Sequence, residues 1–222
     1  MSNQRTPFKM LQKPIPLFDL SIDNLALIIL DLQRLKVDLD GGVARLANLK
    51  GVMSEFKDYY ESADDVLNNI RCILEKCRQL GIKIVFTRIA SKRGDGMDIG
   101  EHISIWSDGF PYRLENEDLV LPMVEGELVI DKRCCNPFNC TDLEEKLRNS
   151  DIRYIILCGA GTPECMQSTC FDAADRGFGV LFVSDAILGF QSSVGNVSGR
   201  LVKIRSTELI LELLEEIGVS QK

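Results

Sequence analysis

Three side chains of different reactivity each follow a short apolar run. Asp31 ends the first run, Lys132 ends the third, and Cys165 comes five residues after the fourth. Near-continuous aliphatic runs are typical of strands in a parallel sheet, and ligands bind outside the carboxyl ends of such strands. We therefore expect a carboxylate, an ammonium group and a thiol to meet at one edge of a sheet. Each alone has a simpler interpretation as a cap, a solvated side chain or a core cysteine, but their combination favours chemistry.

The segment GAGTPEC (159–165) indicates how the thiol would be activated. Thr162 is a favourable N-cap, Pro163 suits the first helical position, and Cys165 then falls in the first turn. Unpaired N–H groups and the positive end of a helix dipole stabilise a thiolate there, and such N–H groups can also accept a developing oxyanion. The G-x-G pattern alone is a weak sign of a dinucleotide site, because the third glycine is missing.

The single histidine, His102, limits the choice of base. Cysteine and serine hydrolases of the triad type use an imidazole base. His102 falls in a long loop, where a solvated or hydrogen-bonded role is the simplest expectation. If the thiol is activated, Asp31 as proton acceptor and Lys132 as electrostatic partner are the means at hand.

The elements that would position these residues alternate between strand and helix. We expect strands at 25–32, 82–88, 127–132, 154–160, 180–187 and 200–204, and helices at 61–81, 141–148, 162–177 and 206–217. Ser62 with Asp65, and Thr141 with Glu144, have the spacing of capping boxes. This alternation predicts an α/β fold, a three-layer α/β/α sandwich with a mostly parallel six-stranded sheet.

Two segments lie outside that alternation. Residues 1–22 contain three prolines and are expected to form an N-terminal arm. It is either disordered or wrapped around the domain that spans 23–222 or around a neighbouring subunit. Residues 89–126 form a long insertion that is either a disordered loop or, as we favour, a lid over the site. Residues 188–199 are too short and too rich in glycine and serine to predict a crossover helix.

Composition excludes several function classes. A net charge of −7 and a pI of about 4.9 argue against binding to nucleic acid or to an anionic membrane. No apolar run is long enough to cross a bilayer and the N-terminus has no secretory signal, so we expect a cytoplasmic protein. The eight cysteines contain no C-x-x-C pair, and with one histidine we expect no metal site. Most of them are expected to be small buried residues.

Three blocks of sequence together resemble the isochorismatase-like cysteine hydrolases, in particular the N-carbamoylsarcosine amidohydrolase-like branch. The blocks are LIILDLQ with its D-x-Q pattern, VIDKRCCNPFNCTDLEEKLR around the lysine, and CGAGTPECMQSTCFDAADRGFGVLFVSDA around the cysteine. The last block is highly specific, whereas D-x-Q alone is weak. The resemblance covers most of the chain from about Leu25 to Ile187.

The resemblance implies a catalytic triad of Asp31, Lys132 and Cys165. It also implies an oxyanion hole formed by the backbone N–H groups of Gly161 and Cys165, and a cis peptide between Ala160 and Gly161. It further implies a homo-oligomer, a dimer or a tetramer. No cofactor is expected. Gln33, Arg88, Trp106 and Phe138 are candidates for binding the substrate.

Two departures from the family narrow the expected function. The nicotinamidase branch binds a metal through an aspartate and two histidines, and this chain has a single histidine. True isochorismatases lack the nucleophilic cysteine that Cys165 would supply. We therefore expect hydrolysis of a carbon–nitrogen bond in a small amide, ureido or N-carbamoyl substrate through a thioester on Cys165. Two alternatives are a catalytically silent protein that binds a metabolite or partner, and a redox-responsive thiol, given that Cys158 and Cys170 are near Cys165 in sequence.

Overall fold

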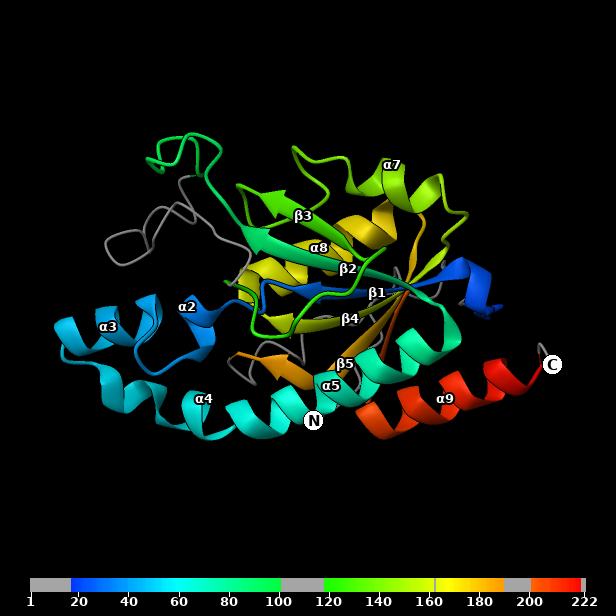
Figure 1. The fold of residues 1–222 in the computed structure, drawn as a ribbon, viewed down its shortest axis with the longest axis horizontal. Coiled ribbons are helices and arrows are strands. Elements are labelled where there is room, and N and C mark those ends of the chain that lie inside the picture. The colour runs from blue at the N-terminus through cyan, green and yellow to red at the C-terminus, as the bar shows by residue number, and fades with distance from the viewer. Residues whose placement is uncertain (1–16, 101–117, 162, 190–200, 221–222) are drawn as a thin grey trace, which may run out of the picture.

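The structure, a computed structural model, describes residues 17–100, 118–161, 163–189 and 201–220. Within these residues one parallel sheet has the strand order β3-β2-β1-β4-β5-β6 (Figure 1). The strands are β1 (Leu25–Leu30), β2 (Lys83–Ile89), β3 (Leu128–Lys132), β4 (Tyr154–Ala160), β5 (Gly179–Leu188) and β6 (Val202–Arg205). The predicted parallel sheet is confirmed, and each strand end falls within two residues of its predicted position.

Helices cover both faces of the sheet, so the predicted three-layer arrangement is also confirmed. α5 (Ala63–Leu80) and α9 (Thr207–Ser220) pack together on one face, and α7 (Leu143–Arg148) and α8 (Pro163–Asp175) lie on the other (Figure 1). Alternate side chains of β1 enter the two cores. Leu25, Leu27 and Ile29 pack towards α5, whereas Ala26, Ile28 and Leu30 pack towards α8.

α5 follows from its apolar stripe and its terminal glycine. The stripe is buried along the whole helix, and Gly81 has the left-handed φ of 71° that ends it. The predicted capping box at its start is wrong. Ser62 has helical φ and ψ, and its hydroxyl donates to the carbonyl of Tyr59, because α4 (Lys57–Glu61) runs directly into α5.

The second predicted capping box is also absent. The Thr141 hydroxyl accepts a hydrogen bond from the Leu143 N–H at 3.1 Å, so that α7 begins two residues later than predicted. The Glu144 carboxylate contacts Arg148 and Arg176 instead of turning back to the backbone. These charges give it stronger partners than a backbone N–H.

Residues 34–61 contain short helices that the periodicity did not predict. They are α2 (Arg34–Val37), α3 (Gly42–Leu49), the 3-10 turn η2 (Met53–Phe56) and α4, and another 3-10 turn, η1 (Ile22–Asn24), precedes β1. Most of these elements have fewer than two turns, which is too short for an apolar stripe to show a helical period.

The end of the predicted arm packs against the sheet. Phe18 packs on Tyr154 with ring centroids 5.1 Å apart, and Lys203 lies 3.8 Å over the Phe18 ring, so the end of the arm contacts β4 and β6. Residues 1–16 and 101–117, including Trp106 and His102, lie outside the described residues. The division into arm, domain and lid stays a prediction.

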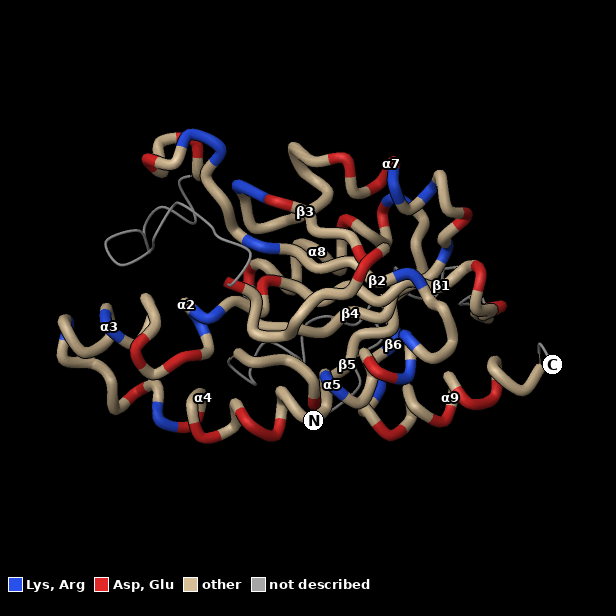
Figure 2. Tube along the Cα trace, viewed as in Figure 1, with Lys and Arg blue, Asp and Glu red and all other residues tan. Residues whose placement is uncertain are grey.

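Acidic residues recur along the outer helices. Figure 2 shows them on α4, α5 and α9, in keeping with the negative charge of the chain. Among the described helices, none combines the length and the apolar character needed to cross a membrane.

Candidate active site

The site lies where the strand order reverses. The chain runs outward from β1 to β2 and β3, and then returns to place β4 on the other side of β1. Crossover connections leave β1 and β4 in opposite directions at this point, which opens a crevice beyond their carboxyl ends. Asp31 directly follows β1 and Gly161 directly follows β4. The topology therefore brings the first apolar run and the GAGTPEC segment to one edge of the sheet.

Asp31 is fixed by the neighbouring strand. Its φ of 47° is left-handed, and its N–H donates to the carbonyl and the hydroxyl of Thr87, both at 3.1 Å. The Thr87 hydroxyl donates in turn to Asp31 Oδ1 at 2.7 Å. Both residues are fully buried. A buried carboxylate is costly unless it is paired, so the remaining oxygen determines what this residue can do.

That oxygen faces two lysines. Asp31 Oδ2 lies 2.8 Å from Lys132 Nζ and 3.3 Å from Lys36 Nζ, and both lysine side chains are buried. Lys36 Nζ also donates to the carbonyl of Ala160 at 2.9 Å, which ties α2 to the end of β4. Burial alone would raise the pKa of Asp31, but the two ammonium groups and the hydrogen bonds outweigh it and lower the pKa.

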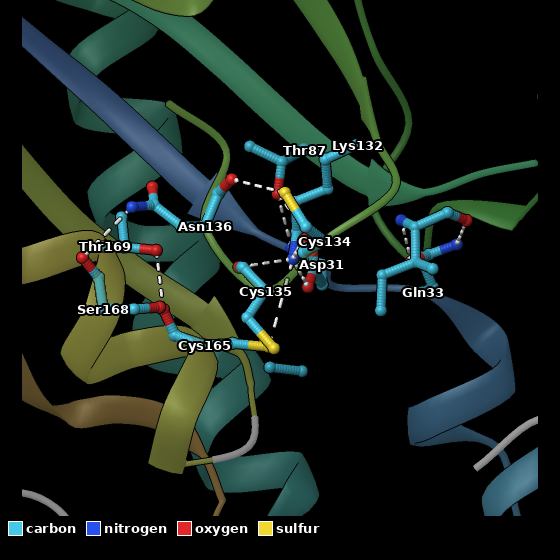
Figure 3. A network of polar contacts seen from close by, with 12 residues as sticks. Asp31, Gln33, Thr87, Lys132, Cys134, Cys135, Asn136, Cys165, Ser168 and Thr169 are labelled. Atoms are coloured by element: carbon cyan, nitrogen blue, oxygen red, sulfur yellow. Dashed lines mark hydrogen bonds and ion pairs between the residues drawn. The ribbon is translucent and has the colours of Figure 1, made fainter. Parts of the chain in front are cut away.

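Lys132 connects the carboxylate to the thiol. Besides Asp31, its Nζ donates to the carbonyls of Cys134 at 3.1 Å and Cys135 at 2.7 Å, and it lies 4.0 Å from Cys165 Sγ (Figure 3). Burial alone would lower the pKa of Lys132, but Asp31 and the Cys165 sulfur raise it. The ammonium form therefore persists at neutral pH. The structure thus brings Asp31, Lys132 and Cys165 together, as their positions predicted.

Cys165 is the third residue of α8 and is buried. Its pKa is lowered to about 5, first because the Cys135 thiol donates a hydrogen bond to its sulfur, and then because Lys132 and Lys36 are close. These effects outweigh burial and the Asp31 charge, which act in the opposite direction. By contrast, burial raises the pKa of Cys170, also on α8, to about 12. The site therefore favours a thiolate at Cys165 only.

The loop between β4 and α8 differs from what the resemblance implied. Among the described residues no peptide bond is cis, so Ala160 and Gly161 are joined by a trans bond. Trans is the form that a non-proline bond favours by about 2.5–4 kcal/mol. The Gly161 N–H donates to the carbonyl of Leu188 at 3.3 Å. To hold an oxyanion, this N–H would have to exchange that partner; the oxyanion hole of Gly161 and Cys165 stays a prediction.

Two of the substrate-binding candidates have protein partners. The Gln33 side chain is buried, accepts from the Ile89 N–H at 2.9 Å and donates to the Ile89 carbonyl at 3.4 Å, which fixes the end of β2. Arg88 pairs with Asp131 at 2.5 Å. It also lines an open cavity of about 840 Å³ with Arg34 and residues 119–123. Because Thr87 points to Asp31, its neighbour Arg88 points to the opposite face of β2.

The other two candidates for binding the substrate are Phe138 and Trp106. The Phe138 ring is buried and stacks on Phe178 with centroids 5.8 Å apart, which favours a structural role. Trp106 lies outside the described residues. The redox alternative named Cys158 and Cys170, yet the thiol that contacts Cys165 is that of Cys135.

Three residues of the site escaped sequence reasoning. Thr87 is an uncharged polar residue directly after the apolar residues 84–86, and this was a usable signal for a contact at the strand end. Lys36 had no such signal, because a lysine normally faces solvent. Cys135 lies three residues after Lys132, but its contact depends on how the loop turns around the Lys132 ammonium group.

The metal site of the nicotinamidase branch needs an aspartate and two histidines. Among the described residues, no group of three histidine, cysteine or carboxylate side chains could hold a metal ion. These residues therefore do not fit such a centre.

Comparisons with known proteins show the family of the chain. The model of the isochorismatase domain matches residues 25–197. The chain is 24% identical to the isochorismatase family protein YecD of Escherichia coli O157:H7 over 89% of this chain and 100% of that protein. It is 23% identical to an N-carbamoylsarcosine amidase of Arthrobacter sp over 69% of this chain and 63% of that protein.

A solved structure supports the fold. The crystal structure of a cysteine hydrolase from Pseudomonas syringae pv. phaseolicola 1448A superposes with a TM-score of 0.75 at 22% identity, and the match covers 92% of this chain and 99% of that one. At this identity the likeness concerns the fold alone.

Proposed function

The chain belongs to the isochorismatase family, and we propose that it is a cysteine hydrolase that cleaves a carbon–nitrogen bond in a small amide, ureido or N-carbamoyl substrate. The observation that carries this proposal is the arrangement of three charges. Cys165 Sγ faces the Lys132 ammonium group at 4.0 Å, and that group is paired with Asp31 at 2.8 Å. A thiolate held by a buried cation is a nucleophile suited to a carbonyl carbon.

The proposed reaction proceeds through a thioester. The Cys165 thiolate attacks the carbonyl carbon, and backbone N–H groups at the start of α8 accept the charge that develops on the oxygen. The carbon–nitrogen bond then breaks as the nitrogen takes a proton, and ammonia or an amine leaves. Water attacks the thioester, the carbon–sulfur bond breaks, and the acid and the thiolate are released.

Asp31 has two roles in this scheme. Its charge keeps Lys132 protonated and oriented towards the sulfur. It also relays a proton from solvent to the departing nitrogen, and it later accepts a proton from the water that attacks the thioester. Because two ammonium groups lower its pKa, the carboxyl group holds a proton only briefly. This suits a proton carrier better than a resting acid.

The substrate class is supported by chemistry and by relatives. Relatives of the chain include an N-carbamoylsarcosine amidase and a nicotinamidase of Arabidopsis thaliana, both of which are named for amide hydrolysis. The sequence has a single histidine, whereas the metal site of the nicotinamidase branch uses two, and this favours the branch whose chemistry depends on the triad alone. The proposal includes a homo-oligomer, a dimer or a tetramer, in the cytoplasm.

One observation favours a second candidate function, a family member that binds a metabolite without turning it over. The Gly161 N–H is already bonded to the Leu188 carbonyl, and Cys165 is only 2% exposed. In a protein without turnover, the Gly161 N–H would stay bonded to Leu188 and Cys165 would stay buried when a ligand binds.

The test is ammonia release from a panel of small amides and ureido acids by three proteins. These are the wild type, Cys165→Ser and the matched control Cys170→Ser, which removes a buried thiol from the same helix. We expect release by the wild type and the control, and a loss of roughly 10⁴-fold or more in Cys165→Ser. Hydrolysis retained by Cys165→Ser would contradict the thioester.

Alkylation of Cys165 by iodoacetamide, followed by mass spectrometry, separates the remaining outcomes. No release from any compound, together with rapid alkylation at neutral pH, would mean that the thiol is reactive and that the substrate lies outside the panel. No release together with an inert Cys165 would favour the binding protein.

A further inference from the structure

The loop after β3 places a second thiol against the reacting sulfur. The Cys135 and Cys165 side chains point towards each other in Figure 3. Both residues also contact the Lys132 ammonium group, Cys135 through its carbonyl at 2.7 Å and Cys165 through its sulfur at 4.0 Å. The pair joins different elements, since Cys135 follows β3 and Cys165 lies in the first turn of α8. None of the eight cysteines is in a disulfide, so both sulfurs are available as thiol or thiolate.

The position of Cys135 is set by the same ammonium group that faces Cys165. Lys132 Nζ donates to the Cys135 carbonyl at 2.7 Å and to the Cys134 carbonyl at 3.1 Å, so the loop curls around this charge. Asn136, the next residue, donates to the Asp172 carboxylate of α8 at 2.7 Å. Cys135 is therefore held from both sides, and its contact with Cys165 follows from a fixed backbone.

We infer that Cys135 is a fourth catalytic residue, whose S–H group hydrogen-bonds to the Cys165 sulfur and stabilises its thiolate in both halves of the reaction. This inference rests on the proposed function, because it assigns a role in that hydrolysis. In the free protein the donor stabilises the attacking thiolate. When the thioester breaks down, the same S–H group stabilises the sulfur as the carbon–sulfur bond breaks, and no bond to Cys135 forms.

The charges around the pair explain why one sulfur keeps the proton and the other loses it. The groups that face Cys165 are Cys135, Lys132 from β3, Lys36 from α2, and Asp31 after β1. The hydrogen bond to Cys165 and burial raise the pKa of Cys135, whereas that same bond and the two lysines lower the pKa of Cys165. The two sulfurs therefore hold a single proton between them at neutral pH, and it stays on Cys135.

The experiment is the pH dependence of Cys165 alkylation, measured peptide by peptide in intact protein. The variants are Cys135→Ala, which removes the donor, and Cys135→Ser, which replaces it with a hydroxyl donor. Cys140→Ser is the matched control, because Cys140 is exposed in the same loop and has no part in the site. If Cys135→Ala does not fold, Cys135→Val removes the donor at nearly the same volume.

We expect the wild type and Cys140→Ser to have an alkylation midpoint near pH 5. Without the donor, the midpoint should rise by at least about one pH unit, a tenfold loss of thiolate on the acid side, and Cys135→Ser should recover most of that shift. A purely structural role would not produce recovery by a hydroxyl. Superimposable profiles in folded wild type and Cys135→Ala would overturn the inference.

Alkylation needs no substrate, so the two proposals can fail separately. A shifted midpoint without any ammonia release would reject the hydrolase and keep the interaction between the two thiols. Ammonia release at the wild-type rate with an unshifted midpoint would keep the hydrolase and reject Cys135.

Discussion

At the scale of single residues, the site is a small cluster of charges that is balanced only when Cys165 is ionised. Two ammonium groups, Lys36 and Lys132, face the single carboxylate of Asp31. With a neutral thiol the buried cluster has an excess positive charge, and with a thiolate it is neutral. Because an uncompensated buried charge is costly, the extra lysine favours ionisation of the thiol. A triad with one lysine would lack this bias.

Replacing each lysine in turn tests this balance. We expect Lys36→Met to raise the alkylation midpoint of Cys165, and Lys132→Met to raise it further, because Lys132 Nζ is closer to Asp31 and also contacts the sulfur at 4.0 Å. We also expect Lys132→Met to lower the free energy of unfolding by roughly 3–5 kcal/mol, the typical cost of breaking a buried pair. Lys36→Met should cost less, since Lys132 still pairs with Asp31. Urea titration measures this cost, and an equal or larger effect of Lys36→Met on both quantities would contradict the assignment.

Sequence could predict that Asp31, Lys132 and Cys165 meet at the carboxyl ends of the strands, and the structure brings these three side chains together. It could not locate Lys36 or Cys135, whose contacts depend on the path of α2 and of the loop after β3. Gln33 and Phe138 illustrate the converse, because their residue types suit a ligand but their partners are the Ile89 backbone and the Phe178 ring.

At the scale of elements, the approach of β1 to β4 sets the geometry of the crevice. Gly159 has a φ of 128°, and a Cβ built on it would lie 2.2 Å from the Leu30 carbonyl oxygen. The pairing of β4 with β5 shifts register between Leu157 and Gly159. Only glycine permits this close contact between Gly159 and Leu30. Leu30 directly precedes Asp31, and Gly159 lies two residues before Gly161.

Gly159→Ala should therefore lower the free energy of unfolding far more than an alanine substitution at another glycine with left-handed φ. The matched control is Gly177→Ala, where φ is 88° and nothing lies within 4 Å of the added Cβ. We expect the control to cost about 1–2 kcal/mol of backbone strain. Gly159→Ala adds a clash with backbone, so it should cost more than about 4 kcal/mol or give no soluble protein. Urea titration and soluble yield measure the difference, and equal costs would refute this account of the strand contact.

Strand prediction succeeded here for a physical reason. Strands buried on both faces are nearly all apolar, as in β1 and β4, and such runs are conspicuous between polar loops. The short helices α2, α3 and α4 have no comparable signal, and α4 also explains the wrong start predicted for α5. The start of α7 was missed because the Thr141 hydroxyl accepts a hydrogen bond from the Leu143 N–H, two residues on, and not from the N–H of Glu144, three residues on, as a capping box would require.

At the scale of the whole molecule, the candidate site affects stability as well as chemistry. The pKa of Cys165 falls from 9.0 in the unfolded chain to about 5 in the folded protein. Between these values the unfolded chain binds a proton that the folded protein does not, so stability rises with pH across that window. The stabilisation is fully present above about pH 9 and is lost as the pH falls through 5.

The other shifted groups of the site act outside this window. Asp31 has a pKa lowered from 3.8, so it contributes at more acidic pH, whereas Lys132 has a pKa raised from 10.5 and contributes at more alkaline pH. We therefore expect the difference in free energy of unfolding between the wild type and Cys165→Ala to grow steadily in favour of the wild type from pH 5 to pH 9. Taking the difference removes the contributions of groups common to both proteins. Urea titrations at several pH values measure it, and a difference that does not change with pH would mean that Cys165 ionises in the folded protein as it does in the unfolded chain.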